Sequence, residues 1–166
     1  MVYGAILEKG EEWYTELGRV FDAIHDRQKE YNWLITDVEY YSDKILDYSV
    51  DRGSCFWLTG EELTCMERTE DSQWVWAVLS GFDKRIPMEE ILSSPRPYAD
   101  CYPGFWENPL TLQHPLASVE IVAFDSSLTL LLSREKSLVD DFRSAFPLSE
   151  DLFLYNQSYN PDRLHE

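Results

Sequence analysis

Apolar residues follow the period of a β-strand most clearly between positions 119 and 133. Alternate positions in two short runs are apolar: Val119, Ile121, Ala123, Leu128, Leu130 and Leu132. A period of two is typical of strands that pack one face on a core. The intervening Val122, Phe124 and Leu131 are apolar as well, so we expect both faces of these strands to be covered. The polar residues 125–127 between the runs predict a tight turn.

Two stretches have the spacing of amphipathic helices. Residues 11–29 carry apolar side chains every three or four positions, with acidic residues in the first turn and basic residues in the last. Residues 134–146 repeat the same spacing between Ser133, a good N-cap residue, and Pro147, which stops a helix. We expect these to be the two main helices of the domain.

The remaining periodic segments predict further strands and a shorter helix. Runs rich in β-branched and aromatic residues predict strands at 2–7, 31–41, 45–50, 55–58, 73–82 and 152–155. In the fifth of these runs Trp74 and Trp76 are expected to share one face. Thr59 and Glu62 have the spacing of a capping box and predict a helix that begins there.

Together these elements predict an α+β fold. We expect one domain over residues 1–155, with a mixed, mostly antiparallel sheet of about five to seven strands and two main helices packed on it. Residues 156–166 are predicted to form a polar C-terminal tail. At 166 residues the chain is long enough to bury a core without a metal or a disulfide.

The segment from 94 to 115 differs from the rest of the chain. It has almost no periodicity and contains five prolines: Pro95, Pro97, Pro103, Pro109 and Pro115. Irregular segments of this length are often functional. Because this one is also aromatic, we expect it to pack on the domain as an ordered loop.

The charge of the chain restricts the class of partner. There are 31 acidic and 14 basic residues, which gives a formal net charge of −17. Such a field repels nucleic acids and anionic lipids and attracts basic proteins. The competing interpretation is that the charge serves solubility alone. The sequence contains no signal-peptide pattern and no apolar run of membrane-spanning length, so we expect a cytoplasmic protein.

No catalytic or metal-binding motif is present. Cys55, Cys65 and Cys101 have no metal-ligand spacing, and the three histidines are scattered. We therefore expect no cofactor, no metal and no enzymatic activity. The alternative is a small enzyme with a cleft that uses Cys101, His114 or Asp125.

Aromatic and acidic residues alternate within the proline-rich segment. We predict a partner-binding site made of Tyr98, Asp100, Tyr102, Phe105, Trp106 and Glu107. Aromatic anchors give affinity, and carboxylates around them speed the approach of a cationic partner. The competing interpretation is that the rings only cover the sheet. A third possibility for the whole chain is a structural or oligomeric scaffold.

Three short segments resemble known sequences. YNWLI at 31–35, GEEL at 60–63 and SLTLLLSREKSLVDDF at 127–142 resemble a small uncharacterised family of bacterial single-domain proteins of unknown function. That resemblance implies no activity and no catalytic residues. The chain is also similar in general character to immunity proteins of polymorphic toxin systems, which are small, acidic, aromatic-rich and α+β. This likeness implies an inhibitor of a basic toxin or nuclease.

Overall fold

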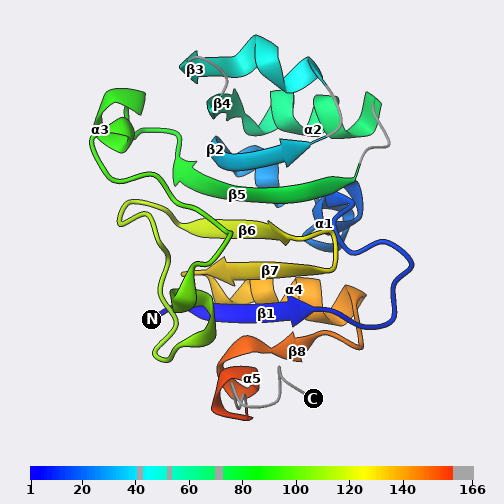
Figure 1. Ribbon diagram of the computed structural model, residues 1–166. Helices are drawn as coiled ribbons and strands as arrows, with labels where there is room; N and C mark the ends of the chain where they lie inside the picture. The colour runs from blue at the N-terminus through cyan, green and yellow to red at the C-terminus, as the bar shows by residue number, and fades with distance from the viewer. Residues whose placement is uncertain (41–42, 52–53, 70–72, 159–166) are drawn as a thin grey trace.

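The computed structural model describes residues 1–40, 43–51, 54–69 and 73–158, and these form a single eight-stranded antiparallel sheet with helices (Figure 1). The strands are β1 (Tyr3–Leu7), β2 (Tyr31–Tyr40), β3 (Ser49–Asp51), β4 (Cys55–Thr59), β5 (Trp74–Asp83), β6 (Val119–Phe124), β7 (Leu128–Ser133) and β8 (Glu150–Asp151). Their order across the sheet is β3-β4-β2-β5-β6-β7-β1-β8. The α+β class is confirmed. The sheet has eight strands rather than five to seven, and the described strand pairs are antiparallel rather than mixed.

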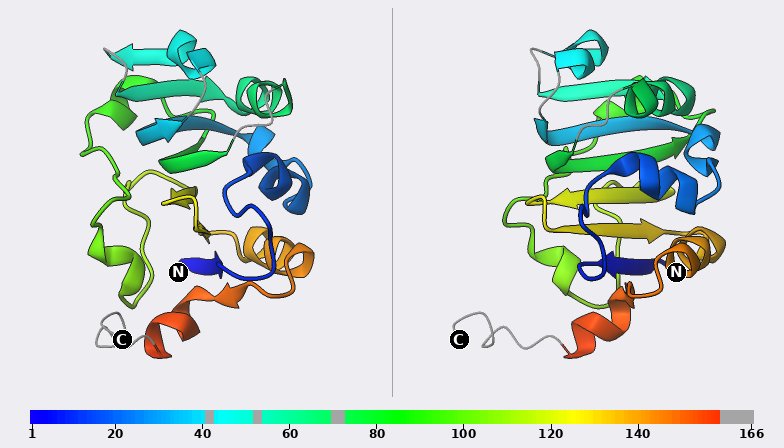
Figure 2. Two further views of the ribbon diagram at one scale, coloured as in Figure 1. Left: turned by 45° about the vertical axis from the view of Figure 1, so that its right-hand side comes forward. Right: turned by 90° about the vertical axis from the view of Figure 1, so that its right-hand side faces the viewer.

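Helices cover one face of this sheet, and an irregular segment covers the other (Figure 2). The α-helices are α1 (Leu17–Ala23), α2 (Gly60–Thr69), α3 (Met88–Leu92), α4 (Lys136–Ala145) and α5 (Leu152–Ser158). The 3₁₀ helices are η1 (Arg27–Glu30), η2 (Asp43–Tyr48) and η3 (Pro103–Trp106). Helices α1, α2 and α4 pack on the first face, which we call the helix face. The segment from 84 to 118 packs on the second face, which we call the loop face.

The hairpin of β6 and β7 forms as the sequence predicts. Its register runs from Val119 opposite Ser133 to Phe124 opposite Leu128. Asp125 and Ser126 in the turn both have positive φ, a conformation that tight hairpins require and that Asp tolerates. Side chains on both faces of the hairpin are buried, which confirms that these strands lie inside the sheet.

The predicted helix over residues 11–29 is mostly wrong. Only α1 and the short η1 form there, and Trp13 is 49% exposed. The chain before α1 is held in an extended form by β5, because the Trp74 N–H donates to the Thr15 carbonyl (3.2 Å) and the Thr15 hydroxyl donates to the Trp74 carbonyl. This pairing joins residues about sixty positions apart. The local pattern of apolar residues therefore cannot predict it.

Four smaller predictions are also wrong. Residues 45–50 form most of η2 and the start of β3, and residues 152–155 belong to α5 rather than to a strand. Trp74 packs on the helix face while Trp76 packs on the loop face, because the pairing of β2 with β5 shifts register at this point. Ser133 is not the N-cap of α4, which begins at Lys136.

Other predictions at the ends of elements hold. The capping box is confirmed: the Glu62 N–H donates to the Thr59 hydroxyl (3.2 Å), and the Thr59 N–H donates to the Glu62 carboxylate (2.8 Å). The second predicted helix is confirmed as α4. Of the expected polar tail, residues 156–158 continue α5, and residues 159–166 lie outside the described part of the chain.

Candidate binding surface

The segment from 84 to 118 fills the loop face with its own apolar side chains. The members of this segment in the hydrophobic cluster are Ile91, Ala99, Phe105, Leu110, Leu112 and Ala117. They pack against sheet residues that include Val78, Phe82 and Val122. The proline-rich loop is therefore packed on the domain, as predicted, and acts as the second layer of the core.

A bulge in β2 anchors the middle of the loop. Asp37 has a φ of 54° and lies where β2 loses register with β5. Its Oδ2 accepts hydrogen bonds from the N–H groups of Ala99 (2.6 Å) and Asp100 (3.1 Å). The adjacent Thr36 hydroxyl donates to the Pro97 carbonyl (2.8 Å). An irregular segment needs such side-chain partners, because its backbone has no ladder or helix to satisfy it.

A buried carboxylate anchors the end of the loop. Glu120 on β6 is fully buried and accepts from the N–H groups of Gln113 and His114, both at 2.9 Å. The Ser80 hydroxyl donates to it as well (3.3 Å). Burial raises the pKa of Glu120 to about 7, although these hydrogen bonds and the Arg134 charge act in the opposite direction.

The same anchor fixes an exposed tyrosine. The Gln113 side chain lies against the backbone of Tyr98: its Oε1 accepts from the Tyr98 N–H (3.1 Å), and its Nε2 donates to the Tyr98 carbonyl (2.8 Å). Glu120 therefore positions Tyr98 through Gln113. The Tyr98 side chain remains 46% exposed, so a large aromatic side chain is presented to solvent on a fixed backbone.

Aromatic rings form a continuous chain across the loop face. Neighbouring ring centroids lie 4.7–5.6 Å apart for the pairs Tyr98–Tyr102, Tyr102–Phe105, Trp106–Phe124 and Trp76–Phe124, and 6.3 Å apart for Phe105–Trp106. Most of these contacts are edge-to-face, a geometry that is favourable for aromatic pairs. This row of rings begins at the exposed Tyr98, passes through buried and half-buried rings, and ends at Trp76 on β5.

The six predicted binding residues do not all reach the surface. Phe105 is 1% exposed and belongs to the core, as the competing interpretation holds, and Tyr102 and Trp106 are half-buried. Tyr98, Asp100 and Glu107 are exposed. A partner that approaches the loop face thus meets one tyrosine and two carboxylates, with the other rings behind them.

Charge is distributed unequally over the two faces. In residues 86–118 the acidic side chains are Glu89, Glu90, Asp100 and Glu107. All four are exposed, and none of them forms an ion pair with a described residue. Arg96, the single Lys or Arg in this range, pairs with Asp51. Several carboxylates around the helix face are instead paired, in Arg27–Glu135, Lys29–Asp26, Arg68–Asp26 and Lys136–Asp140.

The residues of the enzyme alternative have separate structural partners. The Cys101 thiol donates to the Asp100 carboxylate, which raises the thiol pKa and disfavours the nucleophilic thiolate. His114 is buried: the Leu116 N–H donates to its Nδ1, and its Nε2 lies 2.9 Å from the Ile91 carbonyl. Asp125 is an exposed turn residue. No hydrogen bond or ion pair joins any two of these three residues within the described chain.

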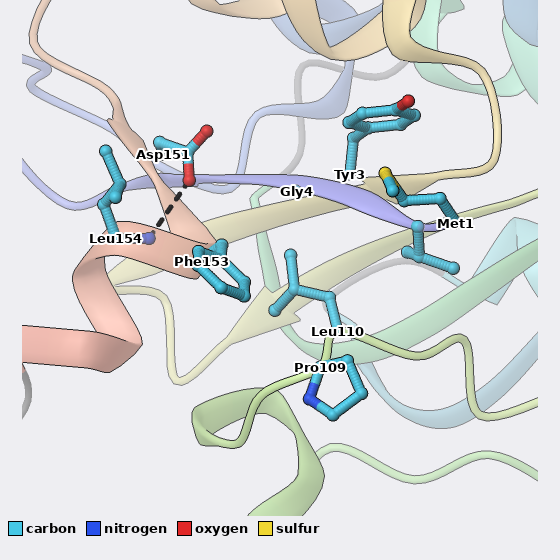
Figure 3. A pocket seen from close by; sticks show the side chains of 9 residues that line it. Met1, Tyr3, Gly4, Pro109, Leu110, Asp151, Phe153 and Leu154 are labelled. Atoms are coloured by element: carbon cyan, nitrogen blue, oxygen red, sulfur yellow. Dashed lines mark hydrogen bonds between the residues drawn. The ribbon is translucent and has the colours of Figure 1, made fainter.

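One feature of the surface was not predicted from the sequence. A groove of about 520 Å³ lies beside the start of β1 and is lined by Met1, Val2, Tyr3, Gly4, Pro109, Leu110, Asp151, Phe153 and Leu154 (Figure 3). Its walls come from three distant segments of the chain. Only the topology of the sheet brings them together, so no local motif indicates the groove.

Comparison with protein-family models, with curated proteins and with solved structures finds no match for this chain. Among the described residues, no helix is long and apolar enough to cross a membrane. In the same part of the chain, His, Cys, Asp and Glu side chains form no cluster of three or more that suits a metal ion.

Proposed function

We propose that this chain is a non-catalytic, acidic, cytoplasmic protein-binding domain whose partner is a basic protein. The loop face is the binding surface, with Tyr98, Asp100 and Glu107 as its exposed contacts. The proposal rests mainly on the four exposed carboxylates of residues 86–118, which lack ion-pair partners among the described residues. Carboxylates without intramolecular partners are free to pair with Lys or Arg of another protein.

The exposed tyrosine supports the same proposal. Tyrosine is frequent at the energetic centres of protein interfaces, because it buries a large ring and keeps a polar end. Tyr98 is fixed on both sides of its peptide by Gln113, so little backbone entropy is lost when a partner covers it. A preorganised ring surrounded by acids suits a basic partner better than a neutral one.

The specific form of the proposal is an immunity-type inhibitor of a basic toxin or nuclease. It is supported by the net charge of −17 and by the general likeness to immunity proteins. A nuclease binds phosphates with a basic surface, and an acidic domain can cover that surface by mimicking the charge of its substrate. Such an inhibitor needs no reactive group of its own.

Affinity capture with charge-matched variants tests the proposal. The variant Asp100→Asn/Glu107→Gln should capture its basic partner with at least tenfold lower affinity than the wild type at 50 mM salt. The control Asp47→Asn/Glu12→Gln removes the same two charge types from exposed positions elsewhere and should change affinity less than twofold. The affinity of the wild type should fall steeply between 50 and 500 mM salt.

Two results would contradict the proposal. The first is capture of a partner that is indifferent to salt, since the electrostatic contribution would then be absent. The second is an equal loss of affinity in both double variants, since net charge rather than the loop face would then decide binding.

A further inference from the structure

The edge of the sheet beside β1 is only partly covered. On one side β1 pairs with β7 along its whole length, from Tyr3 to Leu7. On the other side β8 pairs with Ala5 and Ile6 alone, because the chain turns into α5 at Leu152. Within the described chain, Tyr3 and Gly4 therefore have no strand partner on that side. In an antiparallel sheet, one of two consecutive residues directs its N–H and C=O outward at such an edge.

The groove described above lies directly beside this open edge (Figure 3). Its floor is close-packed at Gly4, where a Cβ atom would lie 3.0 Å from the Leu110 side chain and 3.1 Å from that of Leu152. Glycine lets the end of the loop and the start of α5 meet against β1. The groove is thus a consequence of how three elements converge.

Hydrogen bonds hold the loop and α5 together as the walls of the groove. The Asn108 side chain donates to the Phe153 carbonyl (2.9 Å), and the Asn156 side chain donates to the Phe105 carbonyl (3.0 Å). The Trp106 ring packs beside that of Tyr155, with centroids 6.3 Å apart. These contacts fix the walls before any ligand binds, as preorganised sites require.

Apolar side chains gather at the mouth of the groove. Phe153 is 41% exposed and Leu154 is 61% exposed, and Met1 lies across from them (Figure 3). Asp151 is the one charged residue of the lining. Its Oδ1 accepts a hydrogen bond from the Leu154 N–H (3.1 Å), and its Oδ2 forms an ion pair with Arg143 (3.6 Å).

We propose that this groove binds a short extended segment of a basic protein, which adds a strand beside Tyr3 and Gly4 and places an apolar anchor against Phe153 and Leu154. Strand addition satisfies the open edge by main-chain hydrogen bonds, and the pocket beside it selects the side chain.

Charge selects this occupant over a second copy of the chain. Two copies would bring together two molecules that each carry a net charge of −17, whereas a basic segment is attracted by that charge. The inference rests on the proposed function for the sign of the partner's charge. It adds a second contact surface, which contains none of the six binding residues predicted from the sequence.

Peptide binding to the full chain tests the inference. The probe is a labelled heptapeptide of alternating lysine and leucine, and its affinity is measured by fluorescence anisotropy. Leu154→Asp should weaken binding at least tenfold. The control Leu148→Asp lies outside the groove at the same exposed fraction of 61% and should change affinity less than twofold. Because both variants add the same negative charge, a loss confined to Leu154→Asp cannot come from the change in net charge.

Two altered probes separate the parts of the inference. A heptapeptide N-methylated at alternate residues should bind at least fivefold more weakly, since it lacks N–H donors for the edge. A glutamate–leucine heptapeptide should bind at least tenfold more weakly than the lysine–leucine form. If it binds equally well, the groove is a site for apolar segments and the assignment of a basic occupant to the groove is wrong.

Three further results would contradict the proposal that the groove binds a basic segment. They are absence of binding by the lysine–leucine probe, equal binding to the Leu148→Asp and Leu154→Asp variants, and a stable dimer in sedimentation that Leu154→Asp dissociates. In the third case a second copy is the occupant. None of these three results tests the loop-face proposal, which has its own test with the Asp100 and Glu107 variants.

Discussion

The two faces of the sheet bury apolar side chains by different means. On the helix face α1, α2 and α4 satisfy their own backbone groups and contribute only side chains to the core. On the loop face an irregular segment contributes the apolar side chains. The side chains of Asp37, Gln113 and Glu120 form hydrogen bonds with its backbone. Ordered loops over a rigid scaffold are where binding residues concentrate. This comparison is the reason why our proposal places binding on the loop face.

The ion pairs also differ between the helix face and the loop face. Ion pairs such as Arg27–Glu135 and Arg68–Asp26 link elements around the helix face to one another. On the loop face, Asp100 and Glu107 have no such partner in the described chain. Exposed ion pairs contribute at most about 1 kcal/mol each to stability, so this difference matters more for recognition than for folding.

The largest expected effect is on the free energy of unfolding, and it should differ between two buried phenylalanines. Phe142 on α4 and Phe105 in the loop are both almost fully buried. Phe142→Ala should lower the free energy of unfolding by about 3–5 kcal/mol, since it leaves a cavity in the helix-face core. Phe105→Ala should cost less in global unfolding, because the loop can detach locally while the sheet stays folded.

Denaturant unfolding and limited proteolysis measure this difference together. Phe105→Ala should become sensitive to cleavage within residues 94–115 while its sheet remains folded. Phe142→Ala should be cleaved only in step with global unfolding. Identical proteolysis of the two variants would mean that both faces unfold as one unit.

A smaller effect concerns Glu120 and pH. Its pKa of about 7 in the folded protein lies above the ordinary value of 4.5. Between these values the folded state holds a proton that the unfolded state has released, so stability falls as pH rises from 4.5 to 7. The loss amounts to roughly 3 kcal/mol. Glu120→Gln does not titrate and should lack this slope in thermal or urea unfolding.

His114 requires a control, since burial lowers its pKa and it titrates with the opposite sign. Its contribution is lost as pH falls below the ordinary value of 6.5. Because His114 is present in both proteins, its effect cancels in the difference between wild type and Glu120→Gln. Parallel stability curves for the two proteins would show that Glu120 is ionised throughout the range.

The smallest effect concerns the anchor in β2. Asp37 and Asp125 are both exposed aspartates with positive φ, but only Asp37 accepts described hydrogen bonds from the loop. Asp37→Gly should cost roughly 1–2 kcal/mol and speed hydrogen exchange at Ala99 and Asp100. Asp125→Gly should leave those amides unchanged. Equal effects of both substitutions would mean that backbone strain matters more than the anchor.

Local patterns in the sequence predict the centre of the molecule well. The β6–β7 hairpin, α4 and the Thr59–Glu62 capping box all depend on residues within a few positions of one another. The predicted helix over 11–29 fails where Thr15 pairs with Trp74. It fails because a tertiary hydrogen bond overrides a helical period.

The proposed binding surface is predictable only in part, for the same reason. The composition of residues 98–107 indicates aromatic and acidic contacts, but it cannot separate the buried Phe105 from the exposed Tyr98. The exposed position of Tyr98 depends on Gln113, which lies later in the same loop, and on Glu120 of β6. The groove beside Gly4 joins three distant segments and has no local signature.

Hydrogen–deuterium exchange of the chain with its captured basic partner tests the division of the two faces most directly. The partner should slow exchange in residues 96–108, around Tyr98, Asp100 and Glu107, and leave α1, α2 and α4 unchanged. Protection confined to those three helices, with none in residues 96–108, would contradict the assignment of the loop face as the binding surface.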